Sequence, residues 1–375
     1  MVTKDRGSVY FDKRKSRWIG IVDVGTTVDG KRKRQRVYGA TRTEATRKLA
    51  TLLYDIQVGR PTPDGSMRFD AFFSRWLAQT IEPNASSINT SDHYRLIVDK
   101  HLIPAFGKKR LRDLTVDDVE LFINSKYDAG YAPSTVRRMR MTLVKGLRDA
   151  ERKDLVVRNV ASLTDLRRSR PAHGRSLSEA EANELLQAAK GSRLELAINI
   201  GLQMGLRPGE TLGLSWNNVD LERRILVVDQ SLKRERNQLR IGGVKTPTSR
   251  RSISIPDPLI KLFIEQSHRQ KLDQWVSREL WCDTGLVMTT NIGTAVDPSN
   301  LRRELRRISS RAGLGNWSPN ALRHSFASIL SARGVALESI ADAMGHIDTR
   351  MTSLVYRHQL VEVADAPTVI DGIFQ

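Results

Sequence analysis

The sequence predicts a multidomain α+β protein. We expect a small N-terminal domain of three strands and a helix, an all-helical domain, and a mainly helical C-terminal domain with one small antiparallel sheet. The chain of 375 residues is long enough for two or three domains. Two segments rich in turn-forming residues, 58–66 and 163–174, divide it, and the apolar pattern changes from alternation to helical spacing after the first. The predicted domains are 1–60, 67–168 and 175–375.

The N-terminal domain is predicted from short alternating segments. Three of them read as strands: 9–11, 18–24 and 34–39. Asp29 and Gly30 give a turn signal between the last two. A helix is expected over 43–54, with Thr41 or Thr43 as its cap.

The second domain reads as nearly all helix. Its first apolar residues recur at helical spacing and form one stripe: Phe69, Phe72, Phe73, Trp76 and Leu77. Another helix begins near Thr115, because Asp117 and Asp118 fill its first turn. A third begins at Pro133 and carries a dense run of Arg and Lys.

The C-terminal domain begins with a capping box, Ser178 to Glu181. A buried helix over 196–206 is stopped by Gly205, and Pro208 suits the first turn of the next helix. Segments 225–230 and 251–255 alternate like paired strands with a polar stretch between them. A short amphipathic helix over 337–344 has Gly345 as its C-terminal stop.

Composition narrows the class of protein. No apolar run reaches the length of a membrane helix, and the first residues lack the apolar core of a signal peptide. Cys282 is the only cysteine, which excludes an internal disulfide framework and a cysteine zinc site. The histidines show no metal-ligand spacing, and no GxxxxGK[ST] string is present, so we expect neither a metal nor a nucleotide cofactor. These features favour a soluble protein of a reducing compartment.

The net charge of +19 makes a polyanion the expected partner, because neutralising phosphates releases counterions. An anionic membrane surface is the alternative, but no amphipathic segment with a basic face supports it. Two basic runs suit DNA, one in the first domain and one on the helix from Pro133. The candidate DNA-binding residues are Lys31, Arg32, Lys33, Arg34, Arg36, Arg137, Arg138, Arg140 and Lys145.

Arg207 is the first residue that suggests catalysis. It stands at a helix start, where a positive side chain is unfavourable to the helix dipole unless an anion is bound there. Glu210, in the first turn, reads either as an ordinary dipole-compatible residue or as the acceptor that orients the Arg207 guanidinium.

Further candidate residues follow in a fixed order. Lys245 lies in the polar stretch between the paired strands, with Lys233 as the fallback. Arg323 lies three residues after Asn320, at the start of a helix. His346 follows the glycine stop, and Tyr356 lies ten residues beyond it. His324 reads as structural.

These residues, in this order, resemble the active-site set of the tyrosine recombinases, the phage-integrase family. The resemblance implies that Arg207 and Arg323 hold a DNA phosphate, that His346 adds a hydrogen bond, and that Tyr356 attacks to give a 3′-phosphotyrosine. Lys245 would then protonate the departing 5′ oxygen. The family usually has His where this chain has Asn320, and an amide cannot accept a proton near neutral pH. By layout, domain 1–60 resembles an arm-type DNA-binding domain and 67–168 a core-binding domain.

The predicted function is therefore a site-specific DNA integrase of a phage or mobile element. Two alternatives remain at this stage, a Xer-like chromosome-dimer resolvase and a non-cleaving DNA-binding regulator on the same fold. The resemblance implies double-stranded attachment sites, a homotetramer on paired sites and an accessory directionality or DNA-bending protein, acting in the bacterial cytoplasm at the nucleoid. The tail 361–375 is expected to dock a neighbouring subunit.

Overall fold

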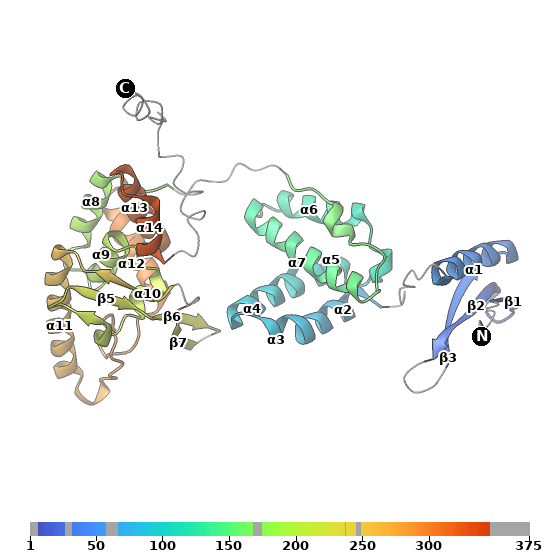
Figure 1. Ribbon diagram of the computed structural model, residues 1–375, viewed down its shortest axis with the longest axis horizontal. Coiled ribbons are helices and arrows are strands. Elements are labelled where there is room, and N and C mark those ends of the chain that lie inside the picture. Colours follow the sequence, from blue (N-terminus) through green and yellow to red (C-terminus); the bar gives the residue numbers. More distant parts are fainter. Residues whose placement is uncertain are drawn as a thin grey trace, which may run out of the picture. The chain divides into compact units, whose positions relative to one another are not determined.

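The computed structural model describes residues 7–26, 32–57, 67–167, 175–236, 238–244 and 249–345. The chain divides into two compact units, Met1–Arg170 and Pro171–Gln375, which are considered separately (Figure 1). No helix among the described residues is both long and apolar enough to cross a membrane.

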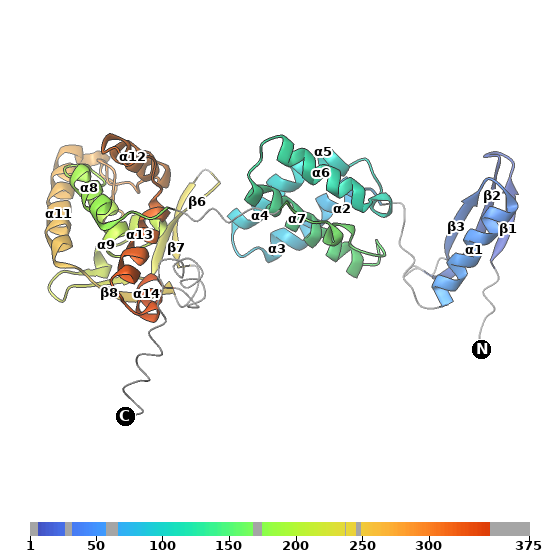
Figure 2. The same cartoon turned by 90° about the horizontal axis from the view of Figure 1, so that it is seen from above.

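A three-stranded antiparallel sheet opens the chain, in the order β1-β2-β3. Its elements are β1 Ser8–Asp12, β2 Arg17–Thr26, β3 Arg32–Gly39 and the helix α1 Arg42–Gln57. The amide of Glu44 donates to the Thr41 hydroxyl, so Thr41 is the cap. Figure 2 shows that α1 lies along the sheet. Ala45 and Leu49 of α1 are buried. The predicted three strands and helix are confirmed.

A helical bundle follows, made of two long interrupted helices and two further helices. Its elements are α2 Phe69–Trp76, η1 Leu77–Ile81, α3 Glu82–Asn84, α4 Ile88–Ile97, η2 Val98–Leu102, α5 Ile103–Phe106, η3 Leu111–Asp113, α6 Val116–Asp128, α7 Pro133–Arg152 and η4 Val160–Leu163. The predicted aromatic stripe is buried in its core, with Phe69, Phe73 and Trp76 almost fully enclosed.

Both interrupted helices contain a π-helical segment, η1 and η2, shortly before a proline. Pro83 and Pro104 each follow their segment by two residues. A proline lacks the amide hydrogen and its ring crowds the carbonyl four residues earlier. Widening the preceding turn accommodates the ring without ending the helix. The sequence therefore explains why these helices continue through a proline.

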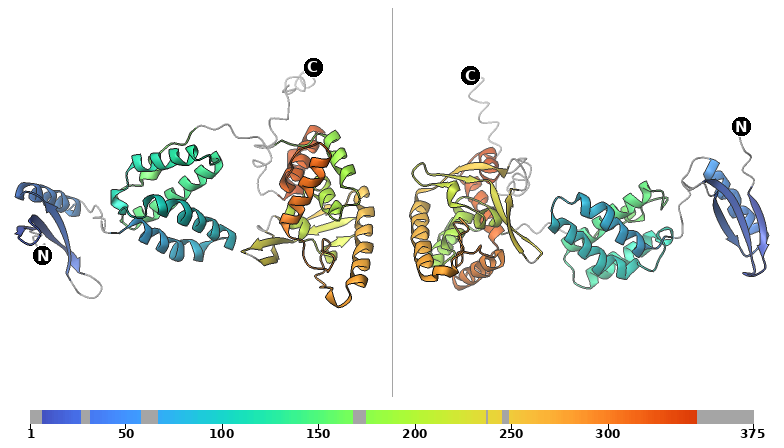
Figure 3. Two further views of the ribbon diagram at one scale, coloured as in Figure 1. Left: turned by 180° about the vertical axis from the view of Figure 1, so that it is seen from behind. Right: turned by 90° about the horizontal axis from the view of Figure 1, so that it is seen from below.

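The C-terminal unit is mainly helical. Its helices are α8 Glu179–Ala189, α9 Glu195–Gln203, α10 Pro208–Leu212, η5 Trp216–Asn218, α11 Asp257–Ser277, η7 Arg278–Leu280, α12 Pro298–Arg311, α13 Pro319–Ala332 and α14 Leu337–Met344. The α9 helix is apolar on nearly all sides and runs through the core, with Leu196, Ile198 and Ile200 buried. Helices α8, α10, α11 and α13 pack against it, and Figure 3 shows the helices of this unit from two further sides.

Two small sheets complete this unit. Their strands are β4 Val219–Asp220, β5 Ile225–Val228, β6 Gln230–Glu235, β7 Gln238–Gly243 and β8 Arg251–Ser254. One sheet has the order β4-β5-β8, which confirms the predicted pairing, and β6 pairs with β7 as a separate hairpin. Few apolar residues mark this hairpin, so the sequence pattern predicts only a polar stretch there. Leu232 opposite Ile241 is its main apolar pair.

Candidate active site

Arg207 is positioned by a sharp reversal of the chain between α9 and α10. Gly205 adopts φ = +65°, a conformation that favours glycine. A Cβ at Gly205 would also lie 2.4 Å from the ring of Phe326, so both the backbone and the packing require glycine. Pro208 begins α10 directly after Arg207. The Arg207 side chain remains 38% exposed and can reach a ligand.

Glu210 is the buried carboxylate that orients Arg207. Its Oε1 accepts from an Nη1 of Arg207 at 2.7 Å, and its Oε2 accepts from the Arg207 backbone amide at 3.0 Å. Burial raises the pKa of Glu210, but the charge and hydrogen bond of Arg251, together with the bonds from Arg207, lower it below its ordinary value of 4.5. Glu210 is therefore ionised at neutral pH. Both interpretations offered by the sequence fit this geometry, because Glu210 accepts from the amide at the helix start and from the guanidinium of Arg207.

Arg323 reaches the same place from α13. The residue is only 5% exposed. Its Nη1 donates to the carbonyl of Gly205 at 2.6 Å, and its Nη2 donates to the carbonyl of Met344 at 2.6 Å. These bonds join the reversal before Arg207 to the end of α14. Two arginines separated by more than a hundred residues therefore flank one small region.

The C-terminus of α14 is the meeting point of three guanidinium groups. Its last carbonyls accept from three different arginines: Ala343 from Arg251 at 2.7 Å, Met344 from Arg323 at 2.6 Å, and Gly345 from Arg207 at 3.3 Å. Helix C-termini carry a partial negative charge and unpaired carbonyls, so cations stabilise them. Gly345 ends the helix at φ = +63°, as predicted.

Arg251 lies beside the candidate site and was not predicted from the sequence. It lies on β8 with a side chain only 8% exposed, and it donates to Glu210 Oε2 at 3.0 Å. The sequence does contain a signal for this position. Arg251, Ile253 and Ile255 are spaced two residues apart, so all three lie on the same face of the predicted strand. An arginine on the inward face of a strand needs a buried acceptor.

Asn320 and His324 lie one turn apart on α13, on either side of Arg323 in the chain. Both residues are exposed. Although much of the His324 side chain reaches solvent, partial burial and then the charge of Arg323 lower its pKa below the ordinary 6.5. His324 is therefore largely neutral at neutral pH.

Three predicted catalytic residues, Lys245, His346 and Tyr356, lie outside the described residues. The fallback, Lys233, is described on β6. Its Nζ donates to the carbonyl of Gly243 at 3.1 Å across the hairpin. The described part of the site is thus Arg207, Glu210 and Arg323, with Asn320 nearby in sequence.

The N-terminal sheet presents a basic and aromatic face. A Cβ at Gly39 would lie 2.6 Å from the Ala45 amide, so Gly39 faces α1. The residues that alternate with it, Arg34, Arg36 and Tyr38, therefore face away from α1 and are exposed. The guanidinium of Arg17 stacks 4.0 Å from the Tyr38 ring centroid.

The structure describes the rest of this basic run in part. Lys31 lies outside the described residues, and Arg32 and Lys33 are described only as backbone of β3. Arg34 pairs with Asp23 at 2.8 Å, and both side chains are about half exposed.

The α7 helix separates an apolar face from a basic one. Val136, Met139 and Leu143 are buried. Arg137, Arg138 and Lys145 are exposed, and Lys145 lies 4.9 Å from the Tyr94 ring centroid.

Arg140 differs from the other basic residues of α7, because its Nε donates to the Thr164 hydroxyl at 3.0 Å. Its Nη2 donates to the carbonyls of Thr164 at 2.6 Å and Ser162 at 3.2 Å. These bonds attach residues 162–164, at the end of the helical bundle, to α7.

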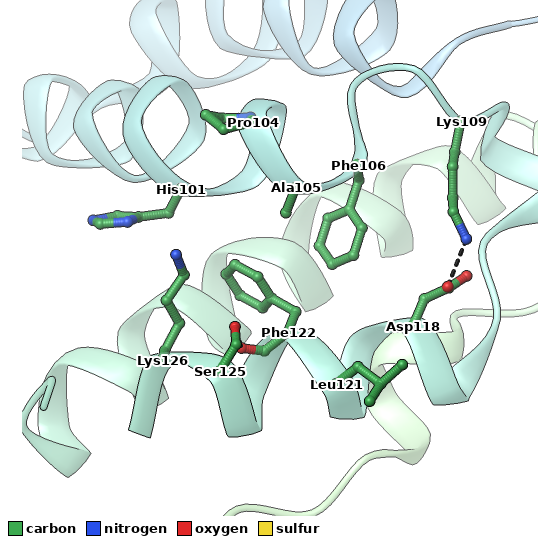
Figure 4. Close-up of a pocket in the computed structure, with 10 residues that line it drawn as sticks. All are labelled: His101, Pro104, Ala105, Phe106, Lys109, Asp118, Leu121, Phe122, Ser125 and Lys126. Carbon is green, nitrogen blue, oxygen red and sulfur yellow. Dashed lines mark hydrogen bonds and ion pairs between the residues drawn. The ribbon is translucent and has the colours of Figure 1, made fainter. Parts of the chain in front are cut away.

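A pocket of about 410 Å³ lies in the helical bundle between α5 and α6 (Figure 4). Lys109 and Asp118 pair at 2.5 Å at one end of it. At the other end Lys126 points toward His101, and partial burial, followed by the charges of Lys126 and Lys100, lowers the pKa of His101. None of the predicted site residues that the structure describes lines this pocket.

Comparisons with known proteins identify the chain. A model of the phage integrase family matches residues 175–362, and a model of the phage integrase N-terminal SAM-like domain matches residues 68–127. The integrase of Streptomyces ambofaciens is 31% identical over 378 aligned residues, which cover 98% of this chain and 96% of that protein. The chain belongs to the phage integrase family.

Solved structures share the fold of this integrase. The Tn1549 transposon integrase in complex with a circular intermediate DNA aligns with a TM-score of 0.67 at 16% identity, covering 83% of this chain and 100% of that chain. The lambda integrase tetramer bound to a Holliday junction aligns with a TM-score of 0.63 at 15% identity, covering 95% and 96%.

The predicted function is confirmed at the level of the family. The protein is an integrase of a phage or mobile element that performs site-specific recombination, and it is a tyrosine recombinase that breaks and rejoins DNA. The roles of individual residues stay predictions.

Proposed function

We propose that this integrase cuts DNA by attack of Tyr356 on a phosphate held by Arg207 and Arg323. The observation that carries the proposal is the convergence of both guanidiniums on the carbonyls of Met344 and Gly345. That helix end directly precedes the segment with His346 and Tyr356 in the chain. A phosphate bound beside it would face two forked cations, which stabilise the extra charge of a pentacoordinate transition state.

The proposed reaction conserves the phosphoester. The Tyr356 phenol gives its proton to solvent water as its oxygen bonds to phosphorus, while the bond from phosphorus to the 5′ oxygen breaks. Lys245 gives a proton to that oxygen, and His346 donates a hydrogen bond to the phosphate. The freed 5′-hydroxyl of a partner strand later attacks the 3′-phosphotyrosine and releases the tyrosine. Because one ester replaces another, the cycle consumes no nucleotide.

Asn320 takes a hydrogen-bonding role in this scheme. It lies in the first turn of α13, three residues before Arg323. An amide donates and accepts hydrogen bonds but does not take up a proton near neutral pH. We therefore assign Asn320 to the phosphate or the nucleophile as a hydrogen-bond partner.

The DNA partner is proposed to be a pair of double-stranded attachment sites held by a homotetramer. Three domains would bind this DNA, namely an arm-type DNA-binding domain (1–60), a core-binding domain (67–168) and a catalytic domain (175–375). The exposed face with Arg34, Arg36 and Tyr38 supports the first role, and Arg137, Arg138 and Lys145 on α7 support the second. An accessory directionality or DNA-bending protein completes the proposed assembly, in the bacterial cytoplasm at the nucleoid.

A covalent-adduct assay tests the proposal. The wild type and Tyr356→Phe are incubated in EDTA with nicked DNA from beside the gene, and SDS-resistant protein–DNA adducts are resolved on a gel. We expect an adduct from the wild type only. Tyr54→Phe is the matched control, because Tyr54 is an exposed tyrosine of α1, and it should form the adduct normally. An adduct from Tyr356→Phe, or the absence of an adduct from the wild type in EDTA, would overturn the proposed mechanism.

A further inference from the structure

Arg251 is a buried cation for which the proposed chemistry has no use. All three nitrogens of its guanidinium donate hydrogen bonds: Nη2 to Glu210 Oε2 at 3.0 Å, Nε to the Ala343 carbonyl at 2.7 Å, and Nη1 to the Ser249 carbonyl at 3.1 Å. Its side chain is only 8% exposed. A group enclosed in this way does not reach a DNA phosphate directly.

Stability alone does not account for an arginine at this position. Removing a guanidinium from water is costly, and an apolar side chain of similar size in the place of a buried ion pair often leaves a protein equally or more stable. What Arg251 adds is a connection. It donates to Glu210, the carboxylate that orients Arg207, and it donates to the carbonyl of Ala343 at the end of α14.

The contacts at the end of α14 form a fixed register. Consecutive carbonyls of Ala343, Met344 and Gly345 are held by Arg251, Arg323 and Arg207 in that order. The fit is tight, because a Cβ at Gly345 would lie 3.0 Å from Arg251 Nη1. A shift of α14 relative to α10 would therefore break the Ala343 bond.

We propose that Arg251 is a positioning residue that sets the distance between the phosphate-binding Arg207 and the chain segment that carries the nucleophile. It does so by tying Glu210 and the Ala343 carbonyl to one rigid guanidinium. The inference rests on the proposed function of Arg207 and Tyr356. It predicts a defect in the chemical step, with little change in DNA affinity.

The first experiment separates binding from chemistry. Full-length Arg251→Met is compared with the wild type for its Kd on a nicked attachment-site duplex and for its single-turnover rate of adduct formation. We expect a Kd within about threefold of the wild type and a rate about 100-fold lower, the scale expected for a misplacement of about 1 Å. Arg223→Met is the control for charge loss, since the Arg223 side chain is 82% exposed, and it should keep the wild-type rate.

A second variant keeps the test decisive if Arg251→Met does not fold. Arg251→Lys retains the positive charge beside Glu210, but one ammonium group on a flexible stem does not reproduce the planar three-way contact. We expect folded protein, unchanged Kd and a rate at least about tenfold below the wild type. A wild-type rate for Arg251→Lys would overturn the proposal.

A modified substrate distinguishes the competing explanation, in which Arg251 acts through Lys245. The bond to the Ser249 carbonyl makes this a real alternative, because Ser249 lies four residues from Lys245. A 5′-bridging phosphorothiolate has a thiolate leaving group that needs no proton donor. We expect Arg251→Met to remain about 100-fold slower than the wild type on this substrate.

These experiments distinguish a failure of the Arg251 proposal from a failure of the proposed function. Recovery of the Arg251→Met rate on the phosphorothiolate would assign Arg251 to the proton donor and overturn positioning. Failure of the wild type itself to form an adduct, or adduct formation by Tyr356→Phe, would instead overturn the proposed function.

Discussion

The carboxylate of Glu210 lies 2.7 Å from the guanidinium of Arg207 and also accepts from the Arg207 backbone amide. One side chain thereby satisfies an amide at the helix start and fixes the rotation of the guanidinium. Arg251 supplies the second cation, so that a single buried carboxylate balances two arginines. The stability of this region and the orientation of the Arg207 guanidinium therefore depend on the same bonds of Glu210.

Glu210→Gln should therefore destabilise the C-terminal unit. The amide preserves the shape but removes the negative charge, which leaves Arg251 buried without a counter-ion. Breaking a buried pair of this kind costs about 3 kcal/mol. Urea unfolding at pH 7 measures the loss. Glu222→Gln, at an exposed turn position, is the matched control and should lie within about 0.5 kcal/mol of the wild type. Equal stability of both variants would contradict the prediction.

The same carboxylate should make stability depend on acid pH. The pKa of Glu210 in the folded protein is below the ordinary 4.5 expected for the unfolded chain. Its ionised form therefore contributes stability that is fully present above about pH 4.5 and is lost as the pH falls through the folded value. Urea midpoints between pH 3 and pH 7 should fall less steeply below pH 4.5 for Glu210→Gln than for the wild type. Parallel curves would show that Glu210 does not contribute.

Local patterns in the sequence predicted most of the elements that carry the site. Gly205 and Pro208 mark the reversal around Arg207, and Gly345 marks the end of α14, because each of these signals acts within a few residues. The three strands before α1 also followed from alternation and a turn signal.

The convergence of three arginines on α14 could not be predicted in the same way. Arg251 and Arg323 meet consecutive carbonyls only because the C-terminal unit packs strand β8 and helix α13 against the same helix end. Such a contact depends on tertiary packing between distant segments, which no local pattern encodes. The β6–β7 hairpin was missed for a different reason, since its two strands carry only three large apolar side chains, Leu232, Leu239 and Ile241, which are too few to mark an alternating pattern.

Gly205→Ala should be costly for two independent reasons, the positive φ and the Phe326 ring 2.4 Å from the added Cβ. Gly191→Ala is the matched control, because Gly191 has φ = +73° and nothing within 4 Å of an added Cβ. The control should lose about 1 kcal/mol from backbone strain. Gly205→Ala should lose about 2 kcal/mol more from overpacking. Urea unfolding of both variants checks the difference, and equal losses would show that Phe326 moves aside freely.

The two arginines Arg138 and Arg140 should behave differently although both lie on α7. Arg138 is exposed, so Arg138→Met should leave thermal stability unchanged and lower the slope of log K against log salt by about 1, the value for one lost phosphate contact. Arg140 is already bonded to Ser162 and Thr164, so Arg140→Met should cost about 1–3 kcal/mol of stability. Its salt slope should stay close to the wild type.

Titrations of an attachment-site duplex at several salt concentrations, with thermal melts of each variant, measure both quantities. If Arg140→Met lowers the salt slope as much as Arg138→Met does, then Arg140 contacts DNA, as its place in the basic run predicts, and its bonds to Ser162 and Thr164 give way when DNA binds.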